Sequence, residues 1–177
     1  MGLSDLFANN VLVKLVRGDN SRYDLIASMV GTRLGDRLLV VGGGDGRLLA
    51  AVGAPTGLTG HVLGVEPDPA TAERVRAAVT AAGVLAEVET APVEQLPVEA
   101  GSFDVAVVPA LSGDVPSTAL SDVRRVLRRG GRAIVLGKAG RNEQAVLQAM
   151  KNAGFPHARL LASRSGLAFF EALNTVG

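Results

Sequence analysis

The sequence lacks several features on which particular classes of protein depend. It contains no cysteine, which excludes disulfide bonds and thiolate metal sites. Its two histidines, His61 and His157, lie far apart and show no metal-ligand spacing, so we expect no metal site. Aromatic residues make up only 3% of the chain and the net charge is +1. These values argue against a nucleic-acid partner bound through stacked rings and basic grooves.

Long apolar runs are also missing. No stretch of about 18 apolar residues occurs, and the first residues contain Asp5 without a basic leader, so we expect no stable membrane insertion and a cytoplasmic location. The chain has 177 residues, of which 47% are hydrophobic, as expected for a single domain whose sheet is covered by helices on both faces. A homo-oligomer is a further interpretation of this composition, because surplus apolar surface is typical of protein interfaces.

The most informative feature is an apolar run that ends in glycines. Residues 38–41 read LLVV and residues 42–46 read GGGDG. A fully apolar strand is typical of the interior of a parallel sheet, and glycines let the backbone approach a ligand closely. Glu66 ends the next apolar run, 20 positions after Gly46. A carboxylate there is placed to accept hydrogen bonds from ribose hydroxyls, so the pattern predicts a ligand that contains adenosine.

The glycine spacing decides between such ligands. A nicotinamide fingerprint needs G-x-G-x-x-G, and counting from Gly42 its third glycine falls at Arg47. The glycines at 42, 44 and 46 instead resemble the G-x-G-x-G loop of class I S-adenosylmethionine-dependent methyltransferases. Further segments resemble that family in the same order: GVEPD at 64–68, EQLP at 94–97 with GSFD at 101–104, and RVLRRGGR at 125–132. One loop alone is weak evidence, whereas four segments in order are strong evidence.

This resemblance, most similar to the ubiquinone and menaquinone methyltransferase-like branch, implies S-adenosylmethionine as cofactor and a small-molecule acceptor. It implies cofactor-binding residues at Gly42, Gly43, Gly44, Asp45, Gly46, Glu66, Pro67, Pro92, Val93 and Pro109. Amides of the loop and of the following helix are expected to serve the methionine end. The implied acceptor site contains Tyr23, Leu111 and Ser112. No catalytic residue is identified, because the cofactor supplies the reactivity and the protein supplies alignment.

Two positions depart from the family pattern. The residue two before the first glycine, normally acidic, is Val40, and an acidic residue that contacts adenine is replaced by Pro92. A charge-assisted hydrogen bond contributes about 1.5–3 kcal/mol, so two losses would weaken cofactor binding by orders of magnitude. A methyltransferase-like binding or scaffold protein without turnover is therefore the alternative. A nicotinamide-dependent oxidoreductase is a second rival, which Arg47 disfavours.

Apolar runs that alternate with helical patterns predict an α/β protein. With the resemblance, they indicate a three-layer Rossmann-like methyltransferase fold, whose mostly parallel seven-stranded sheet ends in an antiparallel C-terminal hairpin. We expect strands near 37–42, 61–65, 85–90, 103–108, 131–136, 158–163 and 167–173, and helices at 69–82, 117–129 and 142–153. Asp68 and Pro69 are typical of a helix start, and residues 164–166 are expected to turn the hairpin.

A further pattern concerns the N-terminal part of the chain, which we expect to form one domain over 1–177. Residues 1–34 are predicted to form an N-terminal helical cap on a sheet core at 35–177, because apolar residues recur at helical spacing from 3 to 15. Packing of this stripe against the domain or a second copy is favoured over contact with a membrane surface.

The arginines at 124, 125, 128, 129 and 132 are expected on the solvated face of a helix, because the chain is nearly neutral.

Overall fold

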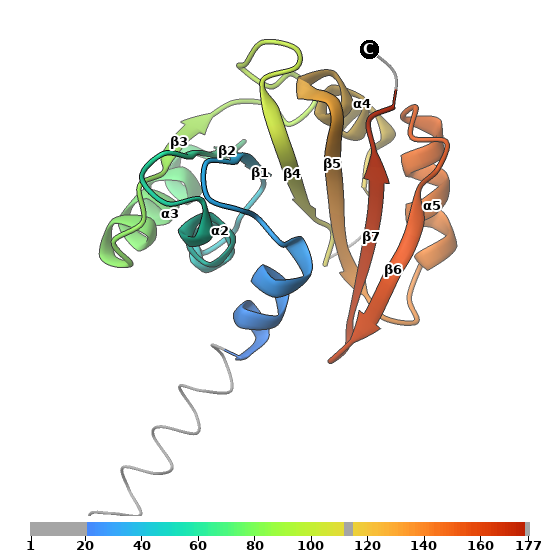
Figure 1. Ribbon diagram of the computed structural model, residues 1–177, viewed down its shortest axis with the longest axis horizontal. Coiled ribbons are helices and arrows are strands. Elements are labelled where there is room, and N and C mark those ends of the chain that lie inside the picture. Colours follow the sequence, from blue (N-terminus) through green and yellow to red (C-terminus); the bar gives the residue numbers. More distant parts are fainter. Residues whose placement is uncertain (1–20, 112–114, 176–177) are drawn as a thin grey trace, which may run out of the picture.

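The structure is a computed structural model that describes residues 21–111 and 115–175. Within them the strands are β1 (Arg37–Val41), β2 (His61–Glu66), β3 (Glu87–Thr90), β4 (Phe103–Pro109), β5 (Leu127–Lys138), β6 (Arg159–Arg164) and β7 (Leu167–Leu173). They form one sheet in the order β3-β2-β1-β4-β5-β7-β6 (Figure 1). The strand β7 runs antiparallel to both of its neighbours, β5 and β6, and the other pairs of neighbouring strands are parallel.

Helices cover both faces of this sheet. They are α2 (Arg47–Gly53), α3 (Pro69–Ala81), α4 (Ser117–Val126) and α5 (Glu143–Asn152), and residues 21–30 are also helical. The helices α4 and α5 pack on one face, whereas α2, α3 and the helix at 21–30 pack on the other. The predicted three-layer α/β fold, with its antiparallel C-terminal hairpin, is confirmed.

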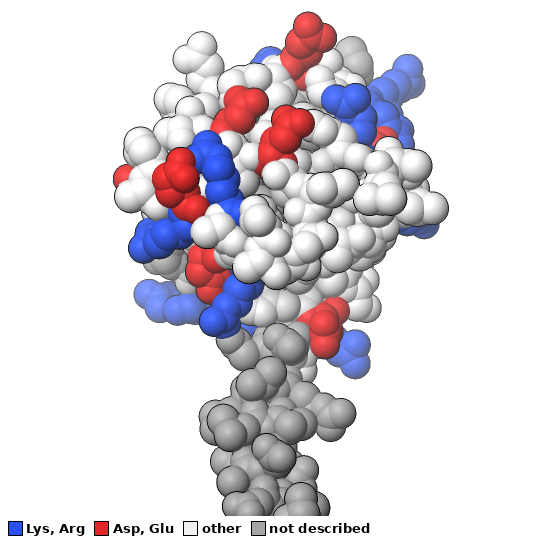
Figure 2. Space-filling view, turned by 90° about the vertical axis from the view of Figure 1, so that its left-hand side faces the viewer, with Lys and Arg blue, Asp and Glu red and all other residues white. Residues whose placement is uncertain are grey.

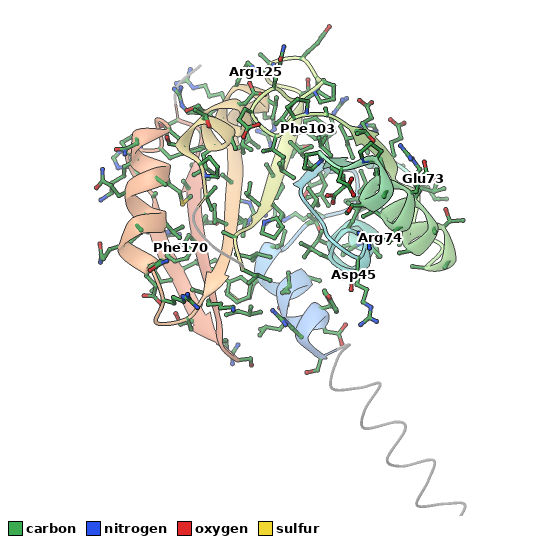
Figure 3. The ribbon with its side chains drawn as sticks, turned by 180° about the vertical axis from the view of Figure 1, so that it is seen from behind. Asp45, Glu73, Arg74, Phe103, Arg125 and Phe170 are labelled. Atoms are coloured by element: carbon green, nitrogen blue, oxygen red, sulfur yellow. The ribbon has the colours of Figure 1, made fainter. Side chains whose placement is uncertain are left out.

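The central strands are buried on both faces. In β1, Leu39 and Val41 contact the cluster under α4 and α5, while Leu38 and Val40 contact the cluster on the opposite face. Burial on both sides explains why this segment is uniformly apolar instead of alternating with polar residues. Phe170 of β7 is fully buried in the cluster under α4 and α5, and Figure 3 shows it beside α5.

The local signals at two turns are confirmed. The carboxylate of Asp68 accepts a hydrogen bond from the amide of Thr71 at 2.8 Å, and the helix α3 begins with a proline. This is the N-cap arrangement that the sequence predicted. Between β6 and β7, Ser165 has φ 51° and Gly166 has φ 75°, so the hairpin closes through a two-residue turn with positive φ at both positions. Such turns match the twist of antiparallel strands.

The boundary between α4 and β5 differs from the prediction. The helix ends at Val126 instead of residue 129, and β5 begins at the next residue, Leu127. The buried Asn174 explains this junction, because its side-chain amide donates to the carbonyl of Leu127 at 2.8 Å and to that of Arg124 at 3.3 Å. The amide of Gly130 donates to the Asn174 carbonyl at 2.7 Å. These long-range bonds outweigh the local helical pattern.

The arginines beyond residue 126 lie on β5, so the prediction that they share a solvated helix face is wrong. Arg132 extends from β5 to the carbonyls of Val30 and Gly31, at 2.8 and 3.2 Å. These carbonyls belong to the last turn of the helix at 21–30 and to the residue after it, where a cation is favourable. Arg132 therefore fixes that helix, which carries Tyr23, against the sheet.

We predict that Asn174→Ala lowers the free energy of unfolding by about 1–3 kcal/mol, because the buried carbonyl of Leu127 then loses its side-chain donor. Urea unfolding followed by circular dichroism measures the change. The exposed neighbouring variant Thr175→Ala is the control and should shift stability by less than about 0.5 kcal/mol. Equal stability of the two variants would show that the junction does not depend on this amide.

Candidate functional site

The glycine loop at 42–46 joins β1 to α2 at the carboxyl edge of the sheet. Gly44 has φ 68°, and a Cβ built there meets nothing within 4 Å, so its missing side chain leaves open space. Gly46 has φ 83°, and a Cβ there would lie 2.7 Å from the Cβ of Ala78 on α3. Two positions of the loop therefore need glycine for different reasons. Gly44 keeps a cavity free, and Gly46 lets α2 pack against α3.

Glu66, the last residue of β2, binds this loop from beneath. Its side chain is buried, with only 4% of the residue exposed. Its Oε1 atom accepts hydrogen bonds from the amide of Gly43 and, at 3.2 Å, from the amide of Gly44. Its Oε2 atom has no hydrogen-bond partner among the described residues. Glu66 therefore orders the loop with one oxygen, while its other oxygen forms no hydrogen bond with a described residue.

Burial governs the ionisation of Glu66. Desolvation raises the pKa of this carboxyl above its ordinary value, and the negative charge of Asp68 raises it further. The two loop amides and the positive charge of Arg74 act in the opposite direction, but they offset only part of the desolvation. A proton therefore competes for this carboxylate at a higher pH than it would on an exposed glutamate.

A first cavity of about 370 Å³ lies beside Glu66. Its walls come from the ends of β1, β2 and β4, from the loop after β3 and from the start of α4. They comprise Val41, Gly42, Gly44, Glu66, Pro67, Val93, Val108, Pro109, Ala110, Val115, Pro116 and Ala119. Apolar walls with a single carboxylate suit a flat base joined to a hydroxylated sugar. Six of the predicted cofactor-binding residues line this cavity.

A second cavity of about 470 Å³ adjoins the first at Gly42, Gly44 and Pro109, which line both. Its other walls are Arg22, Tyr23, Ile26, Gly43, Asp45, Leu48, Leu111, Leu136 and Lys138. The predicted acceptor residues Tyr23 and Leu111 are thus brought together, although they lie far apart in the sequence. The glycine loop separates a compartment that contains the Glu66 carboxylate from a larger one whose mixed walls include the Asp45 carboxylate.

The remaining predicted residues lie outside these walls. Pro92 is exposed and lines neither cavity, while the next residue, Val93, faces the first cavity. Ser112 lies outside the described residues. Gly46 is buried behind the loop as the N-cap residue of α2, and the carboxylate of Asp45 accepts a hydrogen bond from the amide of Arg47, the first residue of that helix, at 3.1 Å. The sequence missed Lys138 and Arg22, because no motif marks them as cavity residues.

Amides of the loop were expected to serve a ligand, and three of them have partners within the protein. The amide of Gly42 donates to the carbonyl of Val65 at 2.9 Å, and those of Gly43 and Gly44 donate to Glu66. These three amides are thus already bonded within the protein. A ligand beside the loop would therefore meet the side chains of the second cavity rather than these three amides.

Tyr23 and Asp45 are two polar side chains of that cavity. Burial raises the pKa of the Tyr23 hydroxyl, and the charge of Asp45 adds to this effect while that of Arg22 opposes it. The Tyr23 hydroxyl therefore keeps its proton and is able to donate a hydrogen bond. Asp45 is exposed and forms an ion pair with Arg47 at 3.5 Å. Figure 3 shows Asp45 near the helix at 21–30, at the opposite end of the domain from Arg125.

Other chemistries are not indicated within residues 21–111 and 115–175. In this part of the chain, no three His, Cys, Asp or Glu residues gather to hold a metal ion, and no helix is long and apolar enough to span a membrane. On the face over α3, Figure 2 shows cations and anions interspersed, without a continuous basic stripe.

A family described as "Methyltransferase domain" matches residues 39–135, which include the glycine loop, Glu66 and the walls of the first cavity. The chain belongs to this family. Among curated proteins, the ubiquinone/menaquinone biosynthesis C-methyltransferase UbiE of Rhizobium johnstonii is 38% identical over 113 residues, which cover 58% of this chain and 41% of that protein.

Two further comparisons define the extent of the similarity. An uncharacterized 37.1 kDa protein in transposon TN4556 of Streptomyces fradiae is 32% identical over 117 residues, or 65% of this chain and 34% of that protein. The chain therefore matches less than half the length of both curated relatives. A crystal structure of a SAM-dependent methyltransferase from Aquifex aeolicus superposes with a TM-score of 0.75 at 16% identity, covering 85% of this chain and 88% of that one. That similarity establishes the fold.

We predict different effects for alanine at the two loop glycines. Gly46→Ala adds a clash with Ala78 to an unfavourable φ, and should lower the free energy of unfolding by about 2–5 kcal/mol. Gly44→Ala should lower it by about 1–2 kcal/mol, through φ alone, but its methyl group enters the cavities and should weaken S-adenosylhomocysteine binding about tenfold. Urea unfolding and calorimetric titration measure the two quantities. Unchanged ligand affinity in Gly44→Ala would rule out this loop as the ligand wall.

Proposed function

We propose that the chain transfers a methyl group from S-adenosylmethionine to a small-molecule acceptor. The observation that carries this proposal is the pairing of Glu66 with the glycine loop between two adjoining cavities. Family membership supports methyl transfer as the reaction, and the free Oε2 atom of Glu66 supports an adenosyl ligand. When bound, the cofactor supplies a methyl group whose bond to sulfur breaks as its bond to the acceptor forms, which leaves a neutral thioether.

The residues fit the two ends of this cofactor. In the first cavity, Oε2 of Glu66 would accept hydrogen bonds from the ribose hydroxyls, and Pro67 and Val93 would contact the adenine. Pro92 provides no carboxylate for the adenine amino group, so Val93 would hold the ring by apolar contact. These roles need no rearrangement of the loop, because Glu66 uses its other oxygen for the amide of Gly43.

The methionine end needs a partner for its ammonium group. Val40, at the position that is normally acidic, is only 1% exposed and packs in the apolar cluster on the α2 side of the sheet. It contributes no charge. Asp45 lines the second cavity beside the loop, and we assign the ammonium group to its carboxylate. Asp45 thereby offsets the departure at Val40.

Alignment is the main contribution of the protein to the reaction. The second cavity has apolar walls at Ile26, Leu48 and Leu136, which exclude water from the approach to the glycine loop. Tyr23 is held protonated and orients an acceptor by donating a hydrogen bond. Among the residues that line this cavity, Asp45 is the one carboxylate, and we assign it to the cofactor. The acceptor therefore needs a nucleophile that reacts without a dedicated base.

The scaffold alternative predicts cavities that are filled by side chains. The two cavities of about 370 and 470 Å³ favour the enzyme instead. We also propose a single domain, with the helix at 21–30 as part of the cap, although residues 1–20 of that cap lie outside the described residues. A cytoplasmic location and the absence of a nucleic-acid partner are proposed from the composition alone.

The first test is thermal unfolding with S-adenosylmethionine, S-adenosylhomocysteine or NADH. A ligand present at about 100 times its dissociation constant adds roughly 2.7 kcal/mol, which raises the melting temperature by about 5–10 °C for a domain of this size. We expect this shift with both sulfur ligands and none with NADH. A shift with NADH alone would favour an oxidoreductase, and no shift with any ligand would favour the scaffold.

The second test uses pH and Glu66. Ribose hydroxyls bind the ionised carboxylate, whose pKa is raised, so affinity for S-adenosylhomocysteine should fall as pH is lowered from roughly 7 to roughly 5. Protonation has the opposite effect on the ligand-free fold, because the folded state binds this proton more tightly than the unfolded chain does. Calorimetric titration across this range measures the change in affinity.

Glu66→Gln separates the two functions of this side chain. Its amide oxygen can still accept from the loop amides, but its second atom becomes a donor, so binding at neutral pH should weaken by about tenfold to a hundredfold. The pH dependence should also disappear, because the amide takes up no proton. Wild-type affinity or an unchanged pH profile in this variant would show that Glu66 does not contact the ligand.

A further inference from the structure

A third cavity lies next to the second. It measures about 530 Å³ and is lined by Ser21, Arg22, Lys138, Ala139, Ser165, Gly166 and Leu167. Arg22 and Lys138 are the residues that it shares with the second cavity. Arg22 and Lys138 therefore place two positive charges where the second cavity adjoins the third.

Three separate segments build this junction. Arg22 lies on the helix at 21–30, and Lys138 is the last residue of β5. The turn of the β6–β7 hairpin closes the far wall, since the amide of Ala139 donates to the carbonyl of Gly166 at 3.0 Å. Figure 1 shows this hairpin turn and the helix at 21–30 at the same end of the sheet. The junction is thus held by the sheet and by the helix that Arg132 fixes.

The two cations are not neutralised by the protein. Neither side chain forms an ion pair or a hydrogen bond with another described residue. By contrast, Arg125 and Arg128, at the far end of the sheet, pair with Asp122 and Asp104. No carboxylate lines the third cavity, so an anion that enters the junction would meet positive charge from two sides.

We propose that the acceptor carries an anionic group, a carboxylate or a phosphate, which binds between Arg22 and Lys138. This inference rests on the proposed methyl transfer. The part of the acceptor that reacts is apolar and lies in the second cavity, against Ile26, Leu111 and Leu136. Whatever lies beyond the anionic group extends into the third cavity, where Ser21 and Ser165 provide hydroxyls.

The cofactor's own carboxylate does not account for Lys138. In the sheet order, β4 separates β1 from β5, so Lys138 lies two strands away from the end of β1, where the glycine loop begins. Two strand spacings amount to about 10 Å. The cofactor carries its carboxylate on the same carbon as the ammonium group that we assign to Asp45, beside the loop. Lys138 is therefore left for a different anion, and this residue provides the test.

The chain offers a matched control for charge. Arg141 lies near Lys138, because both line a small neighbouring cavity, but Arg141 lines neither the second nor the third cavity. Lys138→Met and Arg141→Met each remove one positive charge from the same region. A general electrostatic effect changes both variants alike, whereas a binding site at the junction changes only the first.

The test is titration of the S-adenosylhomocysteine-bound protein with octanoate, octyl phosphate and octanol. We expect wild type to bind at least one of the two anions about tenfold more tightly than octanol, and the stronger anion distinguishes carboxylate from phosphate recognition. Lys138→Met should lose most of this preference, by about threefold to tenfold, and Arg141→Met should keep it. The affinity of Lys138→Met for S-adenosylhomocysteine itself should stay within about twofold of wild type.

Three outcomes overturn the proposal. The first is that octanol binds wild type as tightly as the anions do, and the second is that neither anion binds wild type at millimolar concentration. The third is that the preference for an anion survives in Lys138→Met, whether or not that variant binds S-adenosylhomocysteine more weakly. If wild type binds no S-adenosylhomocysteine, the proposed function fails on its own, and titration of the ligand-free protein still tests the anion site.

Discussion

The contact between the Glu66 carboxylate and the glycine loop is the interaction on which the site depends. Burial of a carboxylate is unfavourable unless hydrogen bonds offset the lost hydration, and the amides of Gly43 and Gly44 supply them. Parallel pairing of β1 with β2 places Val41 beside Val65, so the next residue of β2 reaches the loop directly. Strand register thus fixes the boundary between the two cavities.

The outer walls of the site depend on a second set of contacts. Arg132 connects β5 to the end of the helix at 21–30, and that helix contributes Tyr23 and Arg22 to the cavities. The same strand ends at Lys138. A long β5 therefore links the position of the helix at 21–30 to the positive charge beside the second cavity, and its start is fixed by Asn174.

The sequence predicted those features that depend on neighbouring residues. The glycine spacing, the Asp68 cap and the hairpin turn are local signals, and the fold follows from their order. The end of α4 was predicted wrongly, because the bonds from Asn174 come from 47 residues away and leave no local pattern. The bond of Glu66 to the loop and the cavity position of Lys138 likewise arise only when separate strands pair. Sequence therefore located the loop and its carboxylate, but not the division into cavities.

A crystal structure of the protein with S-adenosylhomocysteine would show whether Glu66 joins the glycine loop to the ribose. We predict ribose hydroxyls at about 3 Å from one oxygen of Glu66, with the amides of Gly43 and Gly44 still donating to the other. We also predict that the adenine lies against Val93. Adenosine bound away from Glu66, or a Glu66 side chain turned out of the loop in the complex, would rule out this role of Glu66.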